Sequence, residues 1–151
     1  MTLEIHPLAN AQLDDLLLLW RQYQEFYRVS DIDDSRNRVH VAGLLEHPQW
    51  GHIHLAYVDG ELSGFSTLYY TFASTRSCRV AILNDLFVVP TRRGRGCGGR
   101  LLDHAIEFVR NQGIGFIRWS TEADNEKAQT LYGRFGKPSE WKVYSVDVLQ
   151  K

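Results

Sequence analysis

VVPTRRGRGCGGRLLDHAIEFV, residues 88–109, is the stretch of this 151-residue chain that decides its fold. Glycine loses more conformational freedom on folding than any other residue, so the dense glycines here require a local reason. An apolar strand pattern precedes the loop, and an amphipathic helix pattern follows it. Such a loop predicts an anion site, because free backbone N–H groups and the helix dipole both attract negative charge. The glycines concerned are Gly94, Gly96, Gly98 and Gly99.

Periodicity on both sides of this stretch predicts a single α/β domain spanning residues 1–151. The expected order is strand, two helices, three strands, helix, strand, helix and strand. Asp59-Gly60 indicates a tight hairpin, and Gly64 indicates a bulge. The expected strands are residues 3–8, 52–58, 61–74, 79–89, 114–122 and 140–149. Helices are expected within residues 10–27 and 39–47, after the glycine loop, and from a cap at Asp124 to Gly136.

Composition excludes several classes of function. The chain contains seventeen Lys and Arg and eighteen Asp and Glu, which gives a net charge of -1, so we expect no nucleic-acid partner. No apolar run approaches the ~20 residues of a membrane span, so we expect no membrane partner. Two cysteines make no disulfide framework, and no signal peptide is recognisable, which together predict a cytoplasmic protein.

The glycine loop fits neither common nucleotide motif. A Walker loop would need a lysine and a hydroxyl residue, and G-x-G-x-x-G does not match cleanly. Residues 93–98 instead fit R-x-x-G-x-G, and residues 125–132 fit N-x-x-A-x-x-L-Y. In this order, the two strings resemble the motifs of the GNAT N-acetyltransferase superfamily. The strings ILNDLFVVP and RWSTEADNEKAQTLY most resemble the polyamine- and histone-type branch, which includes spermidine/spermine acetyltransferases.

The resemblance implies a fold, a co-substrate and roles for particular residues. The fold is a mixed, mostly antiparallel twisted sheet with helices on both faces, and the co-substrate is acetyl-CoA. The strand before the loop is expected to splay from its neighbour after a β-bulge and to pair with the pantetheine arm. Asn125 would contact that arm, and Tyr132 would protonate the departing thiolate. The arm would lie along Leu86, Phe87 and Val88, and the pyrophosphate on the N–H groups of Arg93, Gly94, Arg95, Gly96, Cys97, Gly98 and Gly99.

The general base is expected on the same strand. The polyamine-type relatives carry two tandem acids there, whereas this chain has Asn84-Asp85. Asp85 is therefore the candidate base, acting directly or through water, with Glu122 and the acids of residues 31–34 as alternatives. Those loop acids could instead bind a cationic substrate. Adjacent strand residues face opposite ways, so Asn84 and Asp85 are not expected to face the amine together. The expected substrate-binding residues are Tyr27, Asp31, Asn84 and Glu122, whereas Trp20 and Tyr23 are expected in the core.

The resemblance leaves the acceptor open. A small primary amine or a polyamine is the leading expectation, and a protein lysine or N-terminal amine is the alternative. A non-catalytic acetyl-CoA sensor is a further alternative, because Asn84 replaces an acid. No metal is expected, because no cysteine or carboxylate completes a site with His47, His52 and His54. A homodimer through the last strand is expected, because that sheet edge would need a cover.

Overall fold

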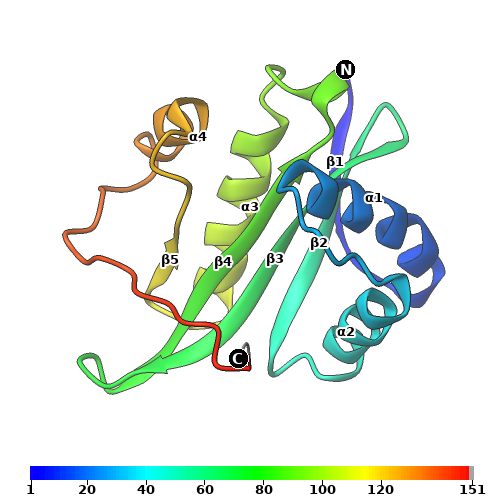
Figure 1. The fold of residues 1–151 in the computed structure, drawn as a ribbon. Coiled ribbons are helices and arrows are strands. Elements are labelled where there is room, and N and C mark those ends of the chain that lie inside the picture. Colours follow the sequence, from blue (N-terminus) through cyan, green and yellow to red (C-terminus); the bar gives the residue numbers. More distant parts are fainter. Residues whose placement is uncertain (150–151) are drawn as a thin grey trace. The chain divides into compact units, whose positions relative to one another are not determined.

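A computed structural model describes residues 1–149, which divide into two compact units, Met1–Ser120 and the residues from Thr121 onward. The prediction of a single domain stays a prediction. Figure 1 shows the elements. In chain order they are β1 (Leu3–Pro7), a 3-10 turn (Asn10–Gln12), α1 (Leu13–Phe26), α2 (Asp34–Glu46), β2 (Gly51–Val58), β3 (Glu61–Ala73), β4 (Cys78–Val88), a 3-10 turn (Pro90–Arg92), α3 (Cys97–Asn111), β5 (Ile117–Trp119) and α4 (Glu126–Tyr132).

The strands of the first unit form one mixed sheet in the order β1-β2-β3-β4-β5. Neighbours from β1 to β4 are antiparallel, and β5 is parallel to β4. Asp59 and Gly60 both have positive φ, as a two-residue hairpin turn requires, so the predicted hairpin is confirmed. The register shifts beside Gly64, which confirms the expected bulge. The predicted fold class, with its crossover from β4 through α3 to β5, is confirmed.

Helices α1 and α2 cover one face of the sheet (Figure 1). Their apolar residues pack on side chains of β2, β3 and β4 that share this face, including Leu55, Phe65 and Phe87. The Trp20 ring stacks on Phe65 with centroids 5.2 Å apart. Trp20 therefore lies in the core, as the sequence predicted, and its burial anchors α1 to the middle of the sheet.

Helix α3 covers the opposite face, where the sheet presents residues of the other parity. Ala56, Val58 and Val88 pack with Leu101 of α3. Towards the other end of the helix, His54 of β2 is 1% exposed and contacts the rings of His104 and Phe108 at 4.6 and 4.5 Å. The histidines singled out in β2 are thus packing residues, and the described chain holds no cluster of three or more metal-ligating side chains.

The C-terminal part of the chain departs from prediction. The expected strand over residues 140–149 is wrong, because residues 133–149 form neither helix nor strand. Its alternating pattern suits a strand, but a strand also needs a hydrogen-bonding partner, and the β-pairings of the described chain include none for this segment. Strand β5 is also shorter than expected, since only Ala81–Leu83 of β4 pair with it. Within residues 1–149, no helix is long and apolar enough to cross a bilayer.

The buried histidines predict a loss of stability in acid. Burial, reinforced by His104 and His52, lowers the pKa of His54 to about 3, and burial also lowers the pKa values of His52 and His104. An unfolded histidine titrates near pH 6.5. Below that pH, the unfolded chain therefore binds more protons than the folded chain. The free energy of unfolding should therefore be highest above pH 6.5 and fall below it, with His54 alone contributing about 1.4 kcal/mol per pH unit.

Urea unfolding between pH 7.5 and 4.5 measures this slope. His54→Leu should flatten it, whereas the control His6→Gln, which removes an exposed histidine, should leave it unchanged. A parent protein with equal stability at pH 7.5 and 5 would contradict the prediction.

Candidate functional site: a splayed strand edge, a glycine loop and a buried carboxylate

The pairing between strands β4 and β5 ends at a β-bulge. Thr67 of β3 lies opposite Asp85, but the next residue, Leu68, lies opposite Leu83, so Asn84 is an extra residue in β4. Leu83 is also the last β4 residue that pairs with β5. A bulge bends its strand and increases its twist, which separates β4 from its parallel neighbour beyond this point. From Asn84 onward, one edge of β4 is therefore free of any strand in the described chain.

The free edge presents the backbone groups of alternate residues. Val89 N–H donates to the carbonyl of Ser63 at 2.9 Å, so this pair is hydrogen-bonded. Antiparallel pairs alternate between bonded and non-bonded, so Phe87 directs its N–H and C=O towards β3. Leu86 and Val88 then direct theirs towards the free edge. The sequence predicted that Leu86, Phe87 and Val88 pair with the pantetheine arm. Of these three residues, only Leu86 and Val88 present backbone groups at the free edge, so the prediction is now restricted to these two.

The glycine loop follows this edge and runs into α3. Gly94 and Gly96 have φ of 76° and 84°, a region that residues with a Cβ rarely adopt. Gly96 precedes the first residue of α3 and supplies no side-chain cap, so the first N–H groups of the helix stay available. Gly98 and Gly99 lie inside the first helical turn, and Gly96 is the residue that turns the chain into the helix.

Cys97 begins α3 and is 2% exposed. Burial raises the pKa of its thiol, so the side chain packs as a small apolar group and the residue can serve a ligand only through its backbone.

The arginines of the loop divide into two pairs. Arg92 forms ion pairs with Glu61 and Asp59 of the β2–β3 hairpin. Arg93 donates its Nε to the carbonyl of Val88 at 2.8 Å and packs its guanidinium 4.6 Å from the Phe26 ring centroid. The remaining pair, Arg95 and Arg100, is exposed and forms no salt bridge among residues 1–149. These two cations are available to an anion on the loop.

A buried carboxylate lies beside the bulge. Asp85 is 5% exposed, and its Oδ1 accepts from the Tyr23 hydroxyl at 2.6 Å and from Asn84 Nδ2 at 3.1 Å. Both donors use Oδ1, which leaves the lone pairs of Oδ2 for another partner. The expectation that Asn84 and Asp85 face opposite ways is wrong, because the bulge interrupts strand alternation and lets the two side chains meet.

The helical spacing of Tyr23 predicts a core position but gives no indication that its hydroxyl donates a hydrogen bond to Asp85. Burial, together with the Asp85 carboxylate, raises the pKa of Tyr23 far above its ordinary value. The phenol therefore remains a hydrogen-bond donor to Asp85. Tyr23 and Asp85 are 62 residues apart in sequence, so no local sequence pattern predicts their hydrogen bond.

Aromatic rings of α1 form a wall next to this carboxylate. Tyr27 contacts Tyr23 and Phe26 edge-on, with centroids 4.9 and 5.1 Å apart. Tyr27 and Phe26, at the helix end, are 42% and 49% exposed, so both rings are accessible to a ligand. Tyr27 thus lies close to Tyr23, the partner of Asp85, and its assignment as a substrate-binding residue stays a prediction.

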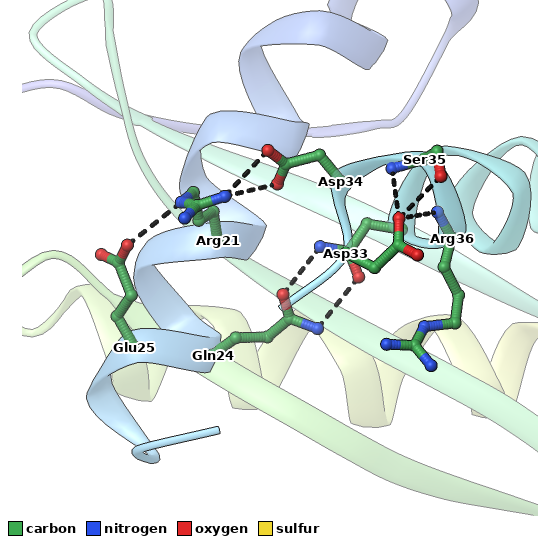
Figure 2. Close-up of polar contacts among 8 residues, drawn as sticks. Arg21, Gln24, Glu25, Asp33, Asp34, Ser35 and Arg36 are labelled. Atoms are coloured by element: carbon green, nitrogen blue, oxygen red, sulfur yellow. Dashed lines mark hydrogen bonds and ion pairs between the residues drawn. The ribbon is translucent and has the colours of Figure 1, made fainter. Parts of the chain in front are cut away.

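The acidic loop between α1 and α2 is engaged by the chain's own groups (Figure 2). Arg21 contacts both carboxylate oxygens of Asp34, at 2.9 and 2.8 Å. Asp33 caps α2, and hydrogen bonds from Ser35 and the Arg36 backbone lower the pKa of its carboxyl. Asp31 pairs with Arg36 at 3.1 Å. The loop thus fixes α2 against α1, and the assignment of Asp31 to substrate binding stays a prediction without a free carboxylate to support it.

The second unit carries the other predicted residues. Asn125, rather than Asp124, caps α4, since its Oδ1 accepts from Ala128 N–H at 3.1 Å. Tyr132 is the last residue of this helix, and Glu122 is exposed before it. The roles proposed for Asn125, Tyr132 and Glu122 stay predictions.

The first unit therefore offers a particular combination: an unpaired strand edge, a glycine cradle with free N–H groups, and two unpaired arginines. These features fit the amide-bearing arm and the pyrophosphate of coenzyme A, which need a backbone edge and an anion site respectively. They define an acyl-coenzyme A transferase. The chain belongs to the acetyltransferase (GNAT) family, whose model matches residues 14–137. It is an N-acetyltransferase, and acetyl-CoA is the co-substrate that the family implies.

Individual relatives agree with this assignment. The chain is 41% identical over 118 residues to the uncharacterized N-acetyltransferase YhfO of Bacillus subtilis, with 78% of each protein covered. It is 29% identical over 140 residues to the thialysine N-epsilon-acetyltransferase of Mus musculus, covering 87% of this chain and 82% of that protein. A crystal structure described as a probable acetyltransferase superposes with a TM-score of 0.85 at 32% identity, covering 98% of this chain and 99% of that one.

The left-handed backbone at Gly96 predicts that a methyl group there weakens the cradle. A non-glycine residue in this region costs about 1–2 kcal/mol, so Gly96→Ala should lower the free energy of unfolding by that amount. If a similar strain is needed to aim the loop N–H groups, the Kd for coenzyme A should rise about tenfold. Calorimetric titration measures the Kd. Gly115→Ala is the matched control, since Gly115 has open space around it and no positive φ. Unchanged binding by Gly96→Ala would show that the cradle does not hold the coenzyme.

Proposed function

We propose that the acetyl acceptor is a small primary amine or a polyamine, and that its nitrogen attacks the thioester directly. The observation that carries this proposal is the buried Asp85 carboxylate, whose Oδ2 is uncommitted beside an aromatic wall. A carboxylate favours an ammonium group electrostatically, and aromatic faces attract cations. Tyr27 and Phe26 supply accessible rings of this kind.

The relatives support an amine acceptor. The mouse relative is named for acetylation of thialysine, and the strings around Asp85 and Tyr132 resemble those of the polyamine-type branch. The alternative acceptors, a protein lysine or an N-terminal amine, present the same ammonium group on a larger body. A non-catalytic acetyl-CoA sensor is disfavoured by the hydrogen bonds that orient Asp85, because a sensor has no need of a positioned base.

Asp85 would act as the base. An ammonium cannot attack a carbonyl, so it must first give a proton to an acceptor within hydrogen-bonding reach. Tyr23 and Asn84 hold Oδ1 and so orient Oδ2, which makes them positioning residues for this step. Asn84, which stands where relatives carry an acid, is thereby reinterpreted as a donor that fixes the remaining acid.

Acetyl-CoA supplies an activated acyl group whose thiolate leaves during the reaction. We propose that Tyr132 protonates this thiolate, as the N-x-x-A-x-x-L-Y string implies.

The homodimer also remains a proposal. Large apolar side chains exposed along residues 141–149 support it, because exposed apolar segments tend to mark interaction sites.

A panel of amines tests the acceptor class. Free thiol released from acetyl-CoA should appear with diamines, polyamines or small primary amines, with kcat/KM at least tenfold above that for lysine-containing peptides. The tenfold margin corresponds to ~1.4 kcal/mol of differential transition-state binding. Faster release with a peptide would move the assignment to the protein-acetylating alternative. Coenzyme binding with no release for any amine would favour the sensor.

Substitution of the proposed base and acid should lower kcat. Positioned acid-base groups contribute about 10²–10⁴-fold, so Asp85→Asn and Tyr132→Phe should each lose activity in that range. The matched controls are Asp103→Asn and Tyr144→Phe, which change exposed residues outside the proposed machinery. Steady-state kinetics on the best amine of the panel measures the loss. Full kcat for Tyr132→Phe across the pH range would show that the acid assignment is wrong.

A further inference from the structure

A buried hydroxyl opposite Asp85 has no hydrogen-bond partner among the described residues. Thr67 is fully buried in β3, and its Oγ1 makes no hydrogen bond within residues 1–149. Thr67 lies directly across from Asp85 in the β3–β4 register. Its side chain points to the face covered by α1, because Phe65, two residues earlier, packs there. An unpaired buried hydroxyl is rare enough to require an explanation at this position.

A second hydroxyl on the same strand leads from this position to the surface. Tyr69 follows Thr67 by two residues and so shares its face of the sheet. Its hydroxyl forms a hydrogen bond of 2.9 Å with Nε2 of His40, which is exposed on α2. Burial, and after it the charge of Asp85, raises the pKa of Tyr69. The Tyr69 phenol therefore stays protonated while it lies within the electrostatic reach of Asp85.

The site needs such a connection if Asp85 is the base. Asp85 is 5% exposed, and Tyr23 covers it from α1. A base that takes one proton per turnover must release it before the next turnover. The other way out would be the side from which the amine reaches Asp85, and substrate or product would occupy that side when the proton has to leave.

We propose that Thr67, Tyr69 and His40 form the path by which the amine's proton leaves Asp85 for solvent. This inference rests on the proposed function, in which Asp85 accepts that proton. The hydroxyls of Thr67 and Tyr69 can each accept one hydrogen bond while donating another, so they pass a proton on without a net change of charge. Because Thr67 Oγ1 makes no hydrogen bond to either neighbour within residues 1–149, a water on each side would complete the bridge between Asp85 and Tyr69.

The proton balance closes over one turnover. The N–H bond of the ammonium breaks and an O–H bond forms on Asp85 Oδ2. Each hydroxyl along the path then gives up one proton and receives another. Nε2 of His40 takes the last proton and passes it to a buffer molecule. No electron pair moves other than those of the O–H and N–H bonds, and every side chain returns to its starting state.

The groups that face this path come from α1 and β4. Tyr23 of α1 and Asp85 of β4 are the titratable neighbours of its inner end. At the outer end, the indole of Trp20 lies 5.8 Å from the His40 ring. Arg79 and His52 lie elsewhere, near Tyr70, which points to the α3 face.

Buffer rescue distinguishes this path from a structural role. His40→Gln keeps a hydrogen-bonding group beside Tyr69 but cannot carry a proton near neutral pH. In weak buffer its kcat should fall about tenfold. This loss is smaller than that caused by removing an acid-base group, because water still accepts protons slowly. Added imidazole should restore kcat towards the parent value, with KM within twofold throughout.

Tyr69→Phe breaks the path further in, so it should lose kcat to a similar extent without recovery in imidazole. His6→Gln is the control and should behave as the parent at every imidazole concentration. Thermal unfolding confirms that each variant is folded, and if Tyr69→Phe is not, rescue of His40→Gln decides alone.

The outcomes separate the two proposals. An active parent whose His40→Gln variant keeps full kcat in weak buffer would overturn the path and leave the proposed function intact. The same holds if His40→Gln loses kcat but imidazole does not restore it. A parent that releases no thiol with any amine would overturn the proposed function, and this inference with it.

Discussion

The bulge at Asn84 is the constraint on which the rest of the site depends. One extra residue in β4 ends the pairing with β5 at Leu83 and frees the strand edge beyond it. The same residue breaks the alternation of side chains, so Asn84 can donate to Asp85. A regular strand would pair its edge with β5 and would turn these two side chains to opposite faces. Edge and carboxylate are thus two results of one backbone irregularity.

Arg93 connects that edge to the aromatic wall at the end of α1. Its Nε occupies the outward-facing carbonyl of Val88, and its guanidinium rests on Phe26 at the end of α1. A ligand that pairs with the Val88 carbonyl must therefore replace or share this donor. Any shift of Arg93 alters the support of Phe26, one of the two accessible rings of the aromatic wall. Occupancy of the strand edge and the shape of the aromatic wall are in this way physically linked.

The sequence predicted the sheet, the helices and the glycine loop because these depend on local periodicity and on turn chemistry. Asp59-Gly60 and Gly96 are examples, since their positive φ values follow from residue type. The strand expected over residues 140–149 had the right pattern but no partner within the described chain, and pairing is not a local property. The same reason hides the Tyr23–Asp85 contact and the bulge, which arise from tertiary packing and register. Motif strings could nominate Asp85, but only the register explains how Asn84 serves it.

Charge placement bears on the choice among cationic acceptors. On sequence alone, the acids of residues 31–34 could attract the distal cations of a polyamine. In the structure Asp34 pairs with Arg21, Asp31 pairs with Arg36 and Asp33 caps α2, so two of the three carboxylates have a cationic partner within the chain. Exposed pairs of this kind add little to stability, but they weaken the local field that would attract a remote ammonium. Asp85 then remains as one buried carboxylate, suited to one ammonium centre. Under the proposed function, the small amine or polyamine would therefore be recognised at its reacting nitrogen and by aromatic contact, rather than through several separated charges.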